Sequence, residues 1–392
     1  MVKFMAFCIL ILLEYFAIAI SGFANHPPEI LNKTCVDIDI GFGLQIHIYR
    51  DTCPEAESII FSNVQNAVYQ DSRMAASLLR LHFHDCFVNA SVLFISIYKE
   101  YYSGSGSCMF FAYRNLFYVQ DSVPEIFMCL CIHKLCLFLQ GCDASVLLDD
   151  TEEFVGEKTA APNLNSLRGF EVIDAIKSQL ESVCPETVSC ADILAIAARD
   201  SVVISGGPGW EVQMGRRDSL SASKALANNN IPGPNSTVAD LVARFQNLGL
   251  SLSDMVALSG AHTMGKARCS SFSARLQGTG FSNGGDINLD FLQSLRQLCS
   301  FSGSNTLAQL DLVTPATFDN QYYVNLLSGE GLLPSDQVLV TEDDQTRAIV
   351  ESYVEDQFAF FEDFKYAMVR MGSLGPLTGN NGEIRWNCRI AN

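Results

Sequence analysis

The chain has 392 residues and a formal net charge of −18, from 25 basic and 43 acidic side chains. This length allows one large core or two smaller ones. The negative charge argues against nucleic acid and against an anionic membrane surface as the main partner, because both repel an acidic protein. The 14 cysteines favour an oxidising compartment, where disulfide bonds form and persist.

The N-terminal residues are typical of a secretory signal peptide. Lys3 precedes a largely apolar run over residues 4–20, and small residues follow where cleavage needs them. The run is too short to favour a permanent membrane span. We therefore predict a signal peptide over residues 1–24, an irregular extension over 25–44, and export from the cell.

Three Asn-X-Ser/Thr triplets are compatible with glycosylation in an extracellular compartment. They begin at Asn32, Asn89 and Asn235. Such triplets also occur by chance, so they are candidates for modification rather than assigned sites.

Most of the remaining chain shows the periodicity of α-helices. Apolar residues recur at spacings of three and four after Cys53 and again through 73–84. The same period continues over 169–183, 189–201, 238–248, 252–258, 291–298, 318–327 and 344–371. Clusters of Gly and Pro separate these segments, and the alternation typical of strands is scarce. We predict one all-α domain over residues 45–392 with loop-rich connections.

Residues 90–140 interrupt this pattern. They hold 11 aromatic residues, four cysteines and only six charges, with no steady helical or strand period. Their most apolar part, 126–139, is short and contains His133 and Lys134, which argues against a membrane helix. One interpretation is an extra hydrophobic hairpin packed on the core. The other, suggested by composition and position, is translated non-coding sequence such as a retained intron.

Two separate motifs carry candidate catalytic groups. Arg80 and His84 stand four residues apart, so that both project from one face of a helix. A histidine that accepts a proton beside a permanent cation suits the cleavage of a polar bond that builds negative charge. His262 follows an apolar helical stretch and the small residues 259–261, which leave space for a flat group. Neither motif is specific when taken alone, because spaced Arg/His pairs and buried histidines are common.

Together these motifs resemble the secretory plant peroxidases, the class III haem peroxidases. The resemblance runs from Leu44 to Asn392, interrupted only by 90–140. It is carried by Arg73–Cys86 (RMAASLLRLHFHDC), 169–174 (GFEVID), 188–194 (VSCADIL), 258–263 (LSGAHT) and 318–320 (FDN). It implies the mostly helical haem-peroxidase fold, with haem b between a distal and a proximal half. It also implies reduction of hydrogen peroxide, one-electron oxidation of phenolic donors, and a monomer secreted to the cell wall or apoplast.

The resemblance assigns roles on the distal side of the haem. His84 corresponds to the base that moves a proton between the peroxide oxygens, and Arg80 to the cation that stabilises the developing charge. Asn163 corresponds to the residue that orients His84. Phe83 corresponds to a wall of the haem edge, and Pro232 to part of the site for the aromatic donor.

On the proximal side, His262 resembles the axial ligand of the iron, and Asp336 the carboxylate that accepts its other ring N–H. Four disulfides follow from the same resemblance: Cys53–Cys184, Cys86–Cys142, Cys190–Cys388 and Cys269–Cys299. Cys8 lies in the signal peptide. Cys35 and the four cysteines within 90–140 have no counterpart in the family.

Two calcium sites are also implied, because hard cations gather carboxylates, hydroxyls and loop carbonyls. The distal set is Asp85, the carbonyls of Val88 and Gly141, Asp143 and Ser145, with Glu157 nearby through water. The proximal set is Thr263, Asp311, Thr314, the carbonyl of Thr317, and Asp319. Residues 90–140 separate Val88 from Gly141 in the distal set.

The interruption leaves an alternative from another class: a non-catalytic secreted protein of the same fold, whose distal calcium site is disrupted. A third class, a disulfide-rich secreted hydrolase, has Ser259 and His262 as its best pair. Their separation does not orient a base onto a hydroxyl. The presence of both histidines and of Arg80 favours the enzyme.

Overall fold

The computed structural model describes residues 43–88, 90–98, 108–112, 115–119, 131–152, 154–277 and 288–392. Residues 43–392 form one compact unit. The expected signal peptide, most of the N-terminal extension, and the triplets at Asn32 and Asn89 lie outside the described residues.

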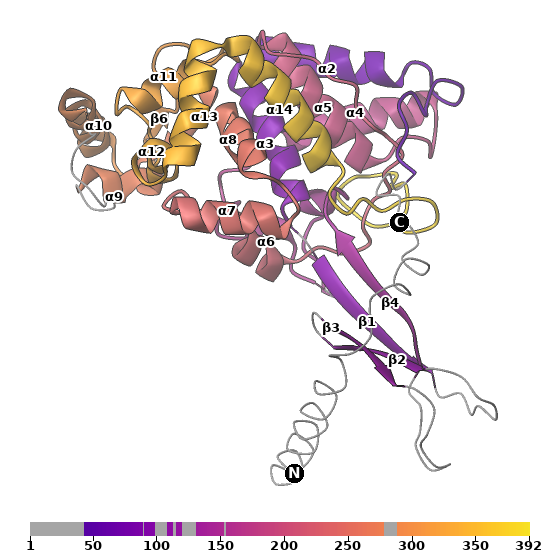
Figure 1. Ribbon diagram of the computed structural model, residues 1–392. Coiled ribbons are helices and arrows are strands. Elements are labelled where there is room, and N and C mark those ends of the chain that lie inside the picture. Colours follow the sequence, from indigo (N-terminus) through magenta and orange to yellow (C-terminus); the bar gives the residue numbers. More distant parts are fainter. Residues whose placement is uncertain are drawn as a thin grey trace. The chain divides into compact units, whose positions relative to one another are not determined.

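Helices make up most of the described chain (Figure 1). In the first half they are α2 (Ala56–Gln70), α3 (Arg73–Cys86), α4 (Phe170–Val183), α5 (Cys190–Ile204), α6 (Lys224–Asn230), α7 (Val238–Asn247) and α8 (Leu252–Ser259). In the second half they are α9 (Ser273–Leu276), α10 (Leu289–Ser302), α11 (Gln321–Leu327), α12 (Pro334–Thr341), α13 (Asp344–Glu355) and α14 (Gln357–Gly372). The predicted all-α fold class is confirmed.

One predicted helix is wrong in its extent. The segment 344–371 forms two helices, α13 and α14, which meet at Asp356. The backbone of Asp356 is extended, and its carboxylate accepts hydrogen bonds from the N–H groups of Phe358 (2.8 Å) and Ala359 (3.2 Å). This cap begins a new helix although the apolar period continues across it, because a carboxylate satisfies N–H groups that lack a helical partner.

Helix α3 lies between two cores. One apolar cluster joins its Ala75 and Leu79 to α7, α8, α11 and α14, and the other joins its Leu78 and Leu81 to α2, α4 and α5. α3 packs most extensively against α5, and α14 against α8. Because both of its flanks are buried, α3 holds the side chains of its last two turns in fixed positions.

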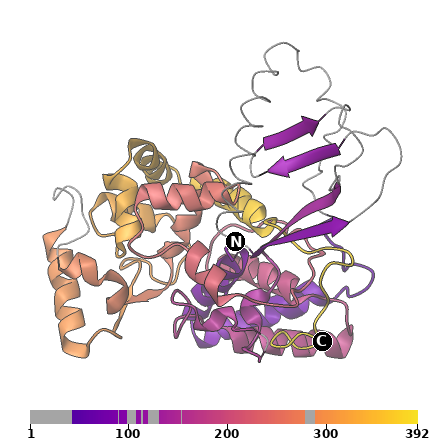
Figure 2. The same ribbon diagram turned by 90° about the horizontal axis from the view of Figure 1, so that it is seen from below.

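Residues 90–140 contain paired strands, although their sequence shows no steady strand period. β1 (Ala90–Tyr98) pairs antiparallel with β4 (Cys131–Gln140), and β2 (Cys108–Ala112) pairs with β3 (Asn115–Val119). Both views show β1 and β4 side by side (Figures 1 and 2). Within this pairing Ala90 lies opposite Gln140. These are the first and last residues of the interruption, so its two ends meet. A further short pair, β5 (Lys266–Arg268) with β6 (Leu307–Gln309), lies in the helical part.

All four expected disulfides are present: Cys53–Cys184, Cys86–Cys142, Cys190–Cys388 and Cys269–Cys299. The second of them spans the interruption, with a sequence separation of 56 residues. Backbone N–H groups on the far side of the interruption continue the closure. Gly141 donates to the carbonyl of Gly375 and Cys142 to that of Leu374, both at 3.1 Å.

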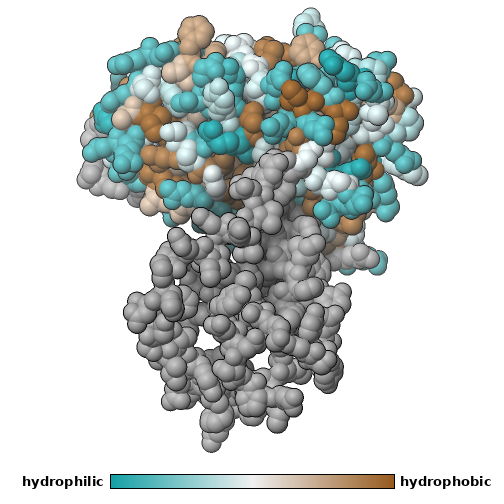
Figure 3. All heavy atoms as spheres, turned by 45° about the vertical axis from the view of Figure 1, so that its right-hand side comes forward, coloured by the Kyte–Doolittle hydropathy of each residue, from teal (hydrophilic) through white to brown (hydrophobic). Residues whose placement is uncertain are grey.

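The described surface mixes hydrophobic and hydrophilic residues (Figure 3). No helix in the described part of the chain is both long enough and apolar enough to cross a membrane.

Candidate active site

His84 sits in the last turn of α3 and is held by Asn163. Its Nδ1 lies 2.5 Å from Asn163 Oδ1, and Asn163 Nδ2 donates to the carbonyl of Glu157 at 2.9 Å. Because the amide oxygen can only accept, Nδ1 carries the proton and Nε2 is left as an acceptor. Burial, together with the charge of Arg80, holds the pKa of His84 well below its ordinary value. The imidazole is therefore a neutral base.

Arg80 lies one turn before His84. Its guanidinium donates to the carbonyls of Pro162 (2.9 Å) and Ser166 (3.2 Å) and to the Ser166 hydroxyl (3.1 Å). Burial lowers its pKa to about 10, so it remains charged at neutral pH. All three acceptors are neutral oxygens, so they leave its positive charge available to an anionic group.

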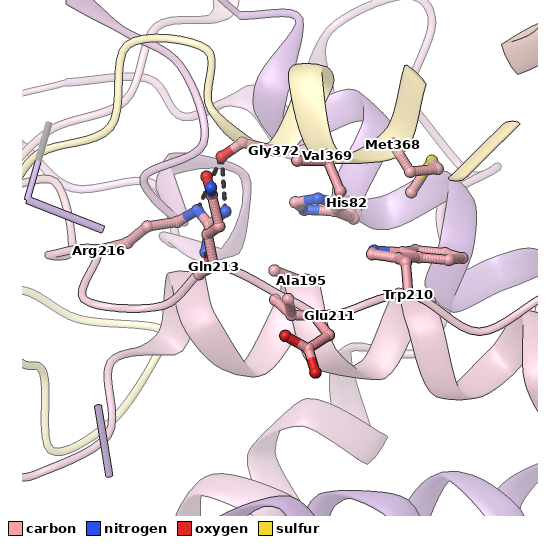
Figure 4. A pocket seen from close by; sticks show the side chains of 10 residues that line it. His82, Ala195, Trp210, Glu211, Gln213, Arg216, Met368, Val369 and Gly372 are labelled. Carbon is pink, nitrogen blue, oxygen red and sulfur yellow. Dashed lines mark hydrogen bonds between the residues drawn. The ribbon is translucent and has the colours of Figure 1, made fainter. Parts of the chain in front are cut away.

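A second histidine of α3, His82, faces the opposite way. Two residues from His84 on a helix, it points to Arg216 and Gly372 instead of to Asn163 (Figure 4). The cavity there has a volume of about 10 Å³, enough for one water molecule. Burial and the charge of Arg216 lower the pKa of His82 to about 3. His82 is therefore a neutral residue of the interior.

His262 lies in a short 3-10 turn, Gly260–Thr263, directly after α8. Its Nδ1 is 2.7 Å from Asp336 Oδ1, at the start of α12. The same oxygen accepts the hydroxyl of Tyr322 at 3.1 Å, and Oδ2 accepts the N–H of Leu333 at 3.3 Å. Burial lowers the pKa of His262, but the charge and hydrogen bond of Asp336 outweigh it, so the net effect raises it.

The side chain of His262 is only partly covered by protein. Burial is the largest influence on the pKa of His262. Nevertheless, 39 % of its side chain remains accessible. The side chain therefore lines an internal hollow. The charge of Arg80 lowers the pKa of both His84 and His262, so the guanidinium is near enough to act on both rings. With Nδ1 bonded to Asp336, His262 offers Nε2 to the hollow as a ligand.

A cluster of buried oxygens adjoins His84. Asp85, Asp143 and Glu157 are at most 2 % exposed. Burial raises the pKa of Asp85, that of Glu157 and, to about 6, that of Asp143; repulsion from a neighbouring carboxylate adds to each rise. Glu157 Oε2 has no hydrogen-bond partner. Three buried carboxylates, one with an unpartnered oxygen, form a donor set that suits a hard cation.

This cluster draws on both sides of the interruption. Asp85 precedes it, and its carboxylate accepts the N–H groups of Ala144 (2.9 Å) and Val146 (3.4 Å), which follow it. Ser145, also part of the expected set, is 4 % exposed and donates its N–H to Asp143 at 3.1 Å. The structure thus brings together the members of the distal set that precede and follow residues 90–140.

A second oxygen cluster follows His262. The hydroxyl of Thr263 donates to Asp311 (3.1 Å) and to Asp319 (3.0 Å), and the hydroxyl of Thr314 approaches the same two carboxylates at 3.3 and 3.1 Å. Thr317 closes this loop by donating its N–H to the carbonyl of Thr314 at 3.1 Å. The four side chains expected here therefore converge on one point.

Comparison with known proteins agrees with this arrangement. The sequence model of the family described as peroxidase matches residues 60–356. The chain is 56 % identical to Peroxidase 40 of Arabidopsis thaliana, over 98 % of both chains. It is 48 % identical to Peroxidase 4 of Vitis vinifera, over 89 % of this chain and 92 % of the relative.

The chain belongs to the peroxidase family. The expected resemblance to the plant haem peroxidases, the mostly helical fold and the enzyme class are thereby confirmed. Membership implies a haem group, and the hollow beside His262 is consistent with it.

Pro232 is half-buried in the turn between α6 and α7 of this peroxidase. Two residues later, the carbonyl of Pro234 accepts the N–H of Ser335 at 3.0 Å. The turn is thereby fastened to the start of α12, which carries Asp336. Its position beside the proximal residues is a result of folding, since about a hundred residues separate the two segments.

Two further residues of the site were not predicted. Ser166 holds the guanidinium of Arg80, and Tyr322 shares the Asp336 oxygen with His262. Tyr322 lies two residues after the FDN motif at 318–320, which was the available signal. The role of its hydroxyl depends on Asp336, 14 residues away.

Proposed function

We propose that this peroxidase uses haem b to reduce hydrogen peroxide, takes electrons one at a time from phenolic donors, and acts outside the cell after removal of its signal peptide. The observation that carries the proposal is the pair of histidines, each fixed through Nδ1, with Arg80 acting on both. Bound haem supplies the redox chemistry. The protein supplies a base, a cation and an axial ligand.

On the distal side, His84 Nε2 accepts the proton of the peroxide oxygen nearer the haem and returns it to the oxygen that leaves as water. Asn163 keeps this nitrogen unprotonated before the transfer by bonding Nδ1. Arg80 stabilises the negative charge that develops as the O–O bond breaks. Phe83, half-buried next to His84, shields the haem edge from water.

On the proximal side, His262 would hold the iron through Nε2, and Asp336 orients its ring. The carboxylate draws the Nδ1–H toward itself, which makes the imidazole a more electron-rich ligand. Pro232 belongs to the surface where a phenolic donor meets the haem edge.

Two calcium ions complete the site. Asp85, the carbonyls of Val88 and Gly141, Asp143 and Ser145 would hold the distal ion, with Glu157 nearby through water. Thr263, Asp311, Thr314, the carbonyl of Thr317, and Asp319 would hold the proximal ion. The distal ion neutralises carboxylates whose burial is otherwise costly. It also steadies His84, because Glu157 accepts from Asn163 through its carbonyl.

The two rival functions lack support in the described residues. For the non-catalytic alternative, the distal calcium site would have to be disrupted, yet Asp85 bonds across the interruption and Cys86 is joined to Cys142. For the hydrolase, the Ser259 hydroxyl would have to face His262, but it donates to the carbonyl of Met255 at 2.8 Å.

Three variants of the full chain test the proposal. His262→Ala is expected to abolish the absorption band of axially ligated haem. His84→Ala should keep that band and lose about 10²–10⁴-fold in the rate of reaction with hydrogen peroxide. His47→Ala, at a histidine whose side chain is 51 % exposed, is the control and should change neither. Wild-type reaction with peroxide in His84→Ala would overturn the proposal.

A further inference from the structure

A row of tyrosines leads away from His262. The ring of Tyr322 meets that of His262 edge-on, with centroids 6.1 Å apart. Tyr322 lies 5.0 Å from Tyr323, and Tyr323 lies 5.0 Å from Tyr353 in α13. All three tyrosines are at most 2 % exposed. They form a continuous row of aromatic rings that begins at His262 and ends where α13 packs on α14.

The hydroxyl partners set these tyrosines apart from ordinary core packing. Tyr353 donates to Asp363 Oδ2 at 2.7 Å, whereas Tyr323 donates to the backbone carbonyl of Val256 at 2.9 Å. A phenol that loses an electron becomes a strong acid and must release its proton. A carboxylate can take that proton and a backbone carbonyl cannot. Tyr322 also donates to a carboxylate, Asp336, but that oxygen is shared with His262 Nδ1. Tyr353 is therefore the outermost place in the row where an oxidised phenol is stabilised, and Tyr323 is a bridge.

Tyr353 starts from the right protonation state. Burial raises its pKa well above the ordinary value, and the hydrogen bond and charge of Asp363 raise it further. The hydroxyl is therefore protonated at neutral pH, and loss of an electron is coupled to transfer of its proton to Asp363.

The outer end of the row reaches solvent. Asp363 is exposed on α14, so it can exchange protons with water. Tyr366, 59 % exposed, follows three residues later and is its neighbour on the helix surface. An aromatic donor can stack on this ring without entering the interior of the protein.

We propose that Tyr322, Tyr323 and Tyr353 conduct electrons to the haem site from a second donor site on the surface of α14, near Asp363 and Tyr366. This site serves phenols that are too large, or too firmly attached to a polymer, to reach the haem edge. The proposal rests on the axial role of His262 proposed above.

The electrons and protons balance. Hydrogen peroxide accepts two electrons and two protons and becomes two water molecules. Each electron leaves Tyr353 as its proton moves to Asp363. A donor phenol then gives one electron to the tyrosyl radical, Asp363 returns the proton to Tyr353, and the donor releases its own proton to water. Two donor molecules supply the two electrons.

A radical measurement tests the path. Haem-loaded full chain is mixed with hydrogen peroxide without a donor, frozen, and examined by electron paramagnetic resonance. We expect a tyrosyl signal that Tyr353→Phe and Asp363→Asn both lose and that Asp363→Glu retains, because asparagine accepts the hydrogen bond but not the proton. Tyr49→Phe removes another tyrosine bonded to a carboxylate, Asp192 at 2.6 Å, and should retain the signal. An undiminished signal in Tyr353→Phe would overturn the proposal.

A donor comparison tests the second site. One phenol is supplied free and also coupled to a large soluble polymer. Tyr353→Phe should keep its rate with the free phenol and lose about tenfold with the coupled one. If Tyr353→Phe kept the wild-type rate with both forms of the phenol, the proposal would be contradicted. The two proposals fail separately: if His262→Ala keeps its haem band, the axial role is wrong, whereas an unaltered Tyr353→Phe in a normal peroxidase refutes only the tyrosine path.

Discussion

The distal and proximal histidines have the same hydrogen-bond geometry and opposite electrostatics. In each, Nδ1 bonds an oxygen: that of Asn163 for His84 at 2.5 Å, and that of Asp336 for His262 at 2.7 Å. The pKa of His84 is lowered and that of His262 is raised. The partner decides the difference, because a neutral amide cannot offset burial and a carboxylate can.

This contrast suits the two roles proposed for His84 and His262. A base for peroxide must be neutral at the working pH and must keep one nitrogen free to accept a proton. An axial ligand must remain bound and donate electron density, which an anionic partner promotes. Exchanging the two partners should therefore exchange the properties of the two histidines.

The largest expected effect comes from Asn163→Asp, which gives His84 a partner like that of His262. The pKa of His84 should rise, so that the base is protonated below the new value. The rate of reaction with hydrogen peroxide should fall by about 10²-fold or more at acidic pH and recover as the pH rises. In the wild type the rate should stay level to well below the ordinary histidine pKa. Stopped-flow absorbance of the haem band against pH measures both.

Asn165→Asp is the matched control, since it places the same charge two residues away on an exposed side chain. It should keep the wild-type profile. If Asn163→Asp gave that profile as well, the account of His84 would be refuted.

The reverse exchange, Asp336→Asn, should have the next largest effect. Without the carboxylate, His262 becomes a weaker electron donor, so the reduction potential of the bound haem should rise. Turnover should fall by about 10- to 100-fold. Redox titration measures the potential, and Asp344→Asn, at an exposed aspartate of α13, is the control. An unchanged potential would show that Asp336 only positions the ring.

Removal of calcium should make the free energy of unfolding depend on pH through the buried carboxylates on the distal side. Burial raises the pKa of Asp143 to about 6, and it also raises those of Asp85 and Glu157. In calcium-free protein the folded state then holds more protons than the unfolded state, so the free energy of unfolding should fall as pH rises through about 6. Added calcium should remove this fall. Urea unfolding at several pH values, with calcium or a chelator, measures it.

Glu157→Gln sharpens that test, because it removes the charge of the carboxylate with an unpartnered oxygen. It should reduce the loss of stability in calcium-free protein at neutral pH. The same loss in the variant and in the wild type would argue against repulsion within this cluster as its cause.

Deletion of residues 90–140 should have a small effect on the site. Because Ala90 pairs with Gln140, the flanking residues already lie together. Haem binding and turnover should stay within about twofold, and the free energy of unfolding within about 2 kcal/mol by the logarithmic loop rule. Loss of haem on deletion would mean that the interruption supports the fold. The proposal of a retained intron is tested separately, by counting mature transcripts that carry the segment.

The smallest effect is expected for Tyr322→Phe, which leaves Asp336 Oδ1 to His262 alone. The carboxylate should then bind the Nδ1–H more strongly and lower the reduction potential of the haem slightly, in the direction opposite to Asp336→Asn. The lost hydrogen bond should cost about 1 kcal/mol of stability. Redox titration and urea unfolding measure the two effects, and a raised potential would contradict the first.

The sequence predicted those parts of the fold that depend on local order. Arg80 and His84 share a face of α3 because four residues complete about one helical turn. The break between α13 and α14 at Asp356 was missed because the spacing of apolar residues continues across it. The side-chain cap that starts α14 does not change that spacing. The strands within 90–140 were missed because antiparallel pairing joins residues as distant as Ala90 and Gln140.

In the candidate site, residue order established which chemical groups are present, and the resemblance to a family assigned them roles. The sequence could not show whether Asp85 and Asp143, which lie on opposite sides of residues 90–140, come close together in space. Tertiary structure decided that, through the ribbon of β1 and β4 and the bonds from Asp85 to Ala144 and Val146. It also decided which partner each histidine has. Burial and neighbouring charge control proton affinity, and both arise only when distant segments pack together.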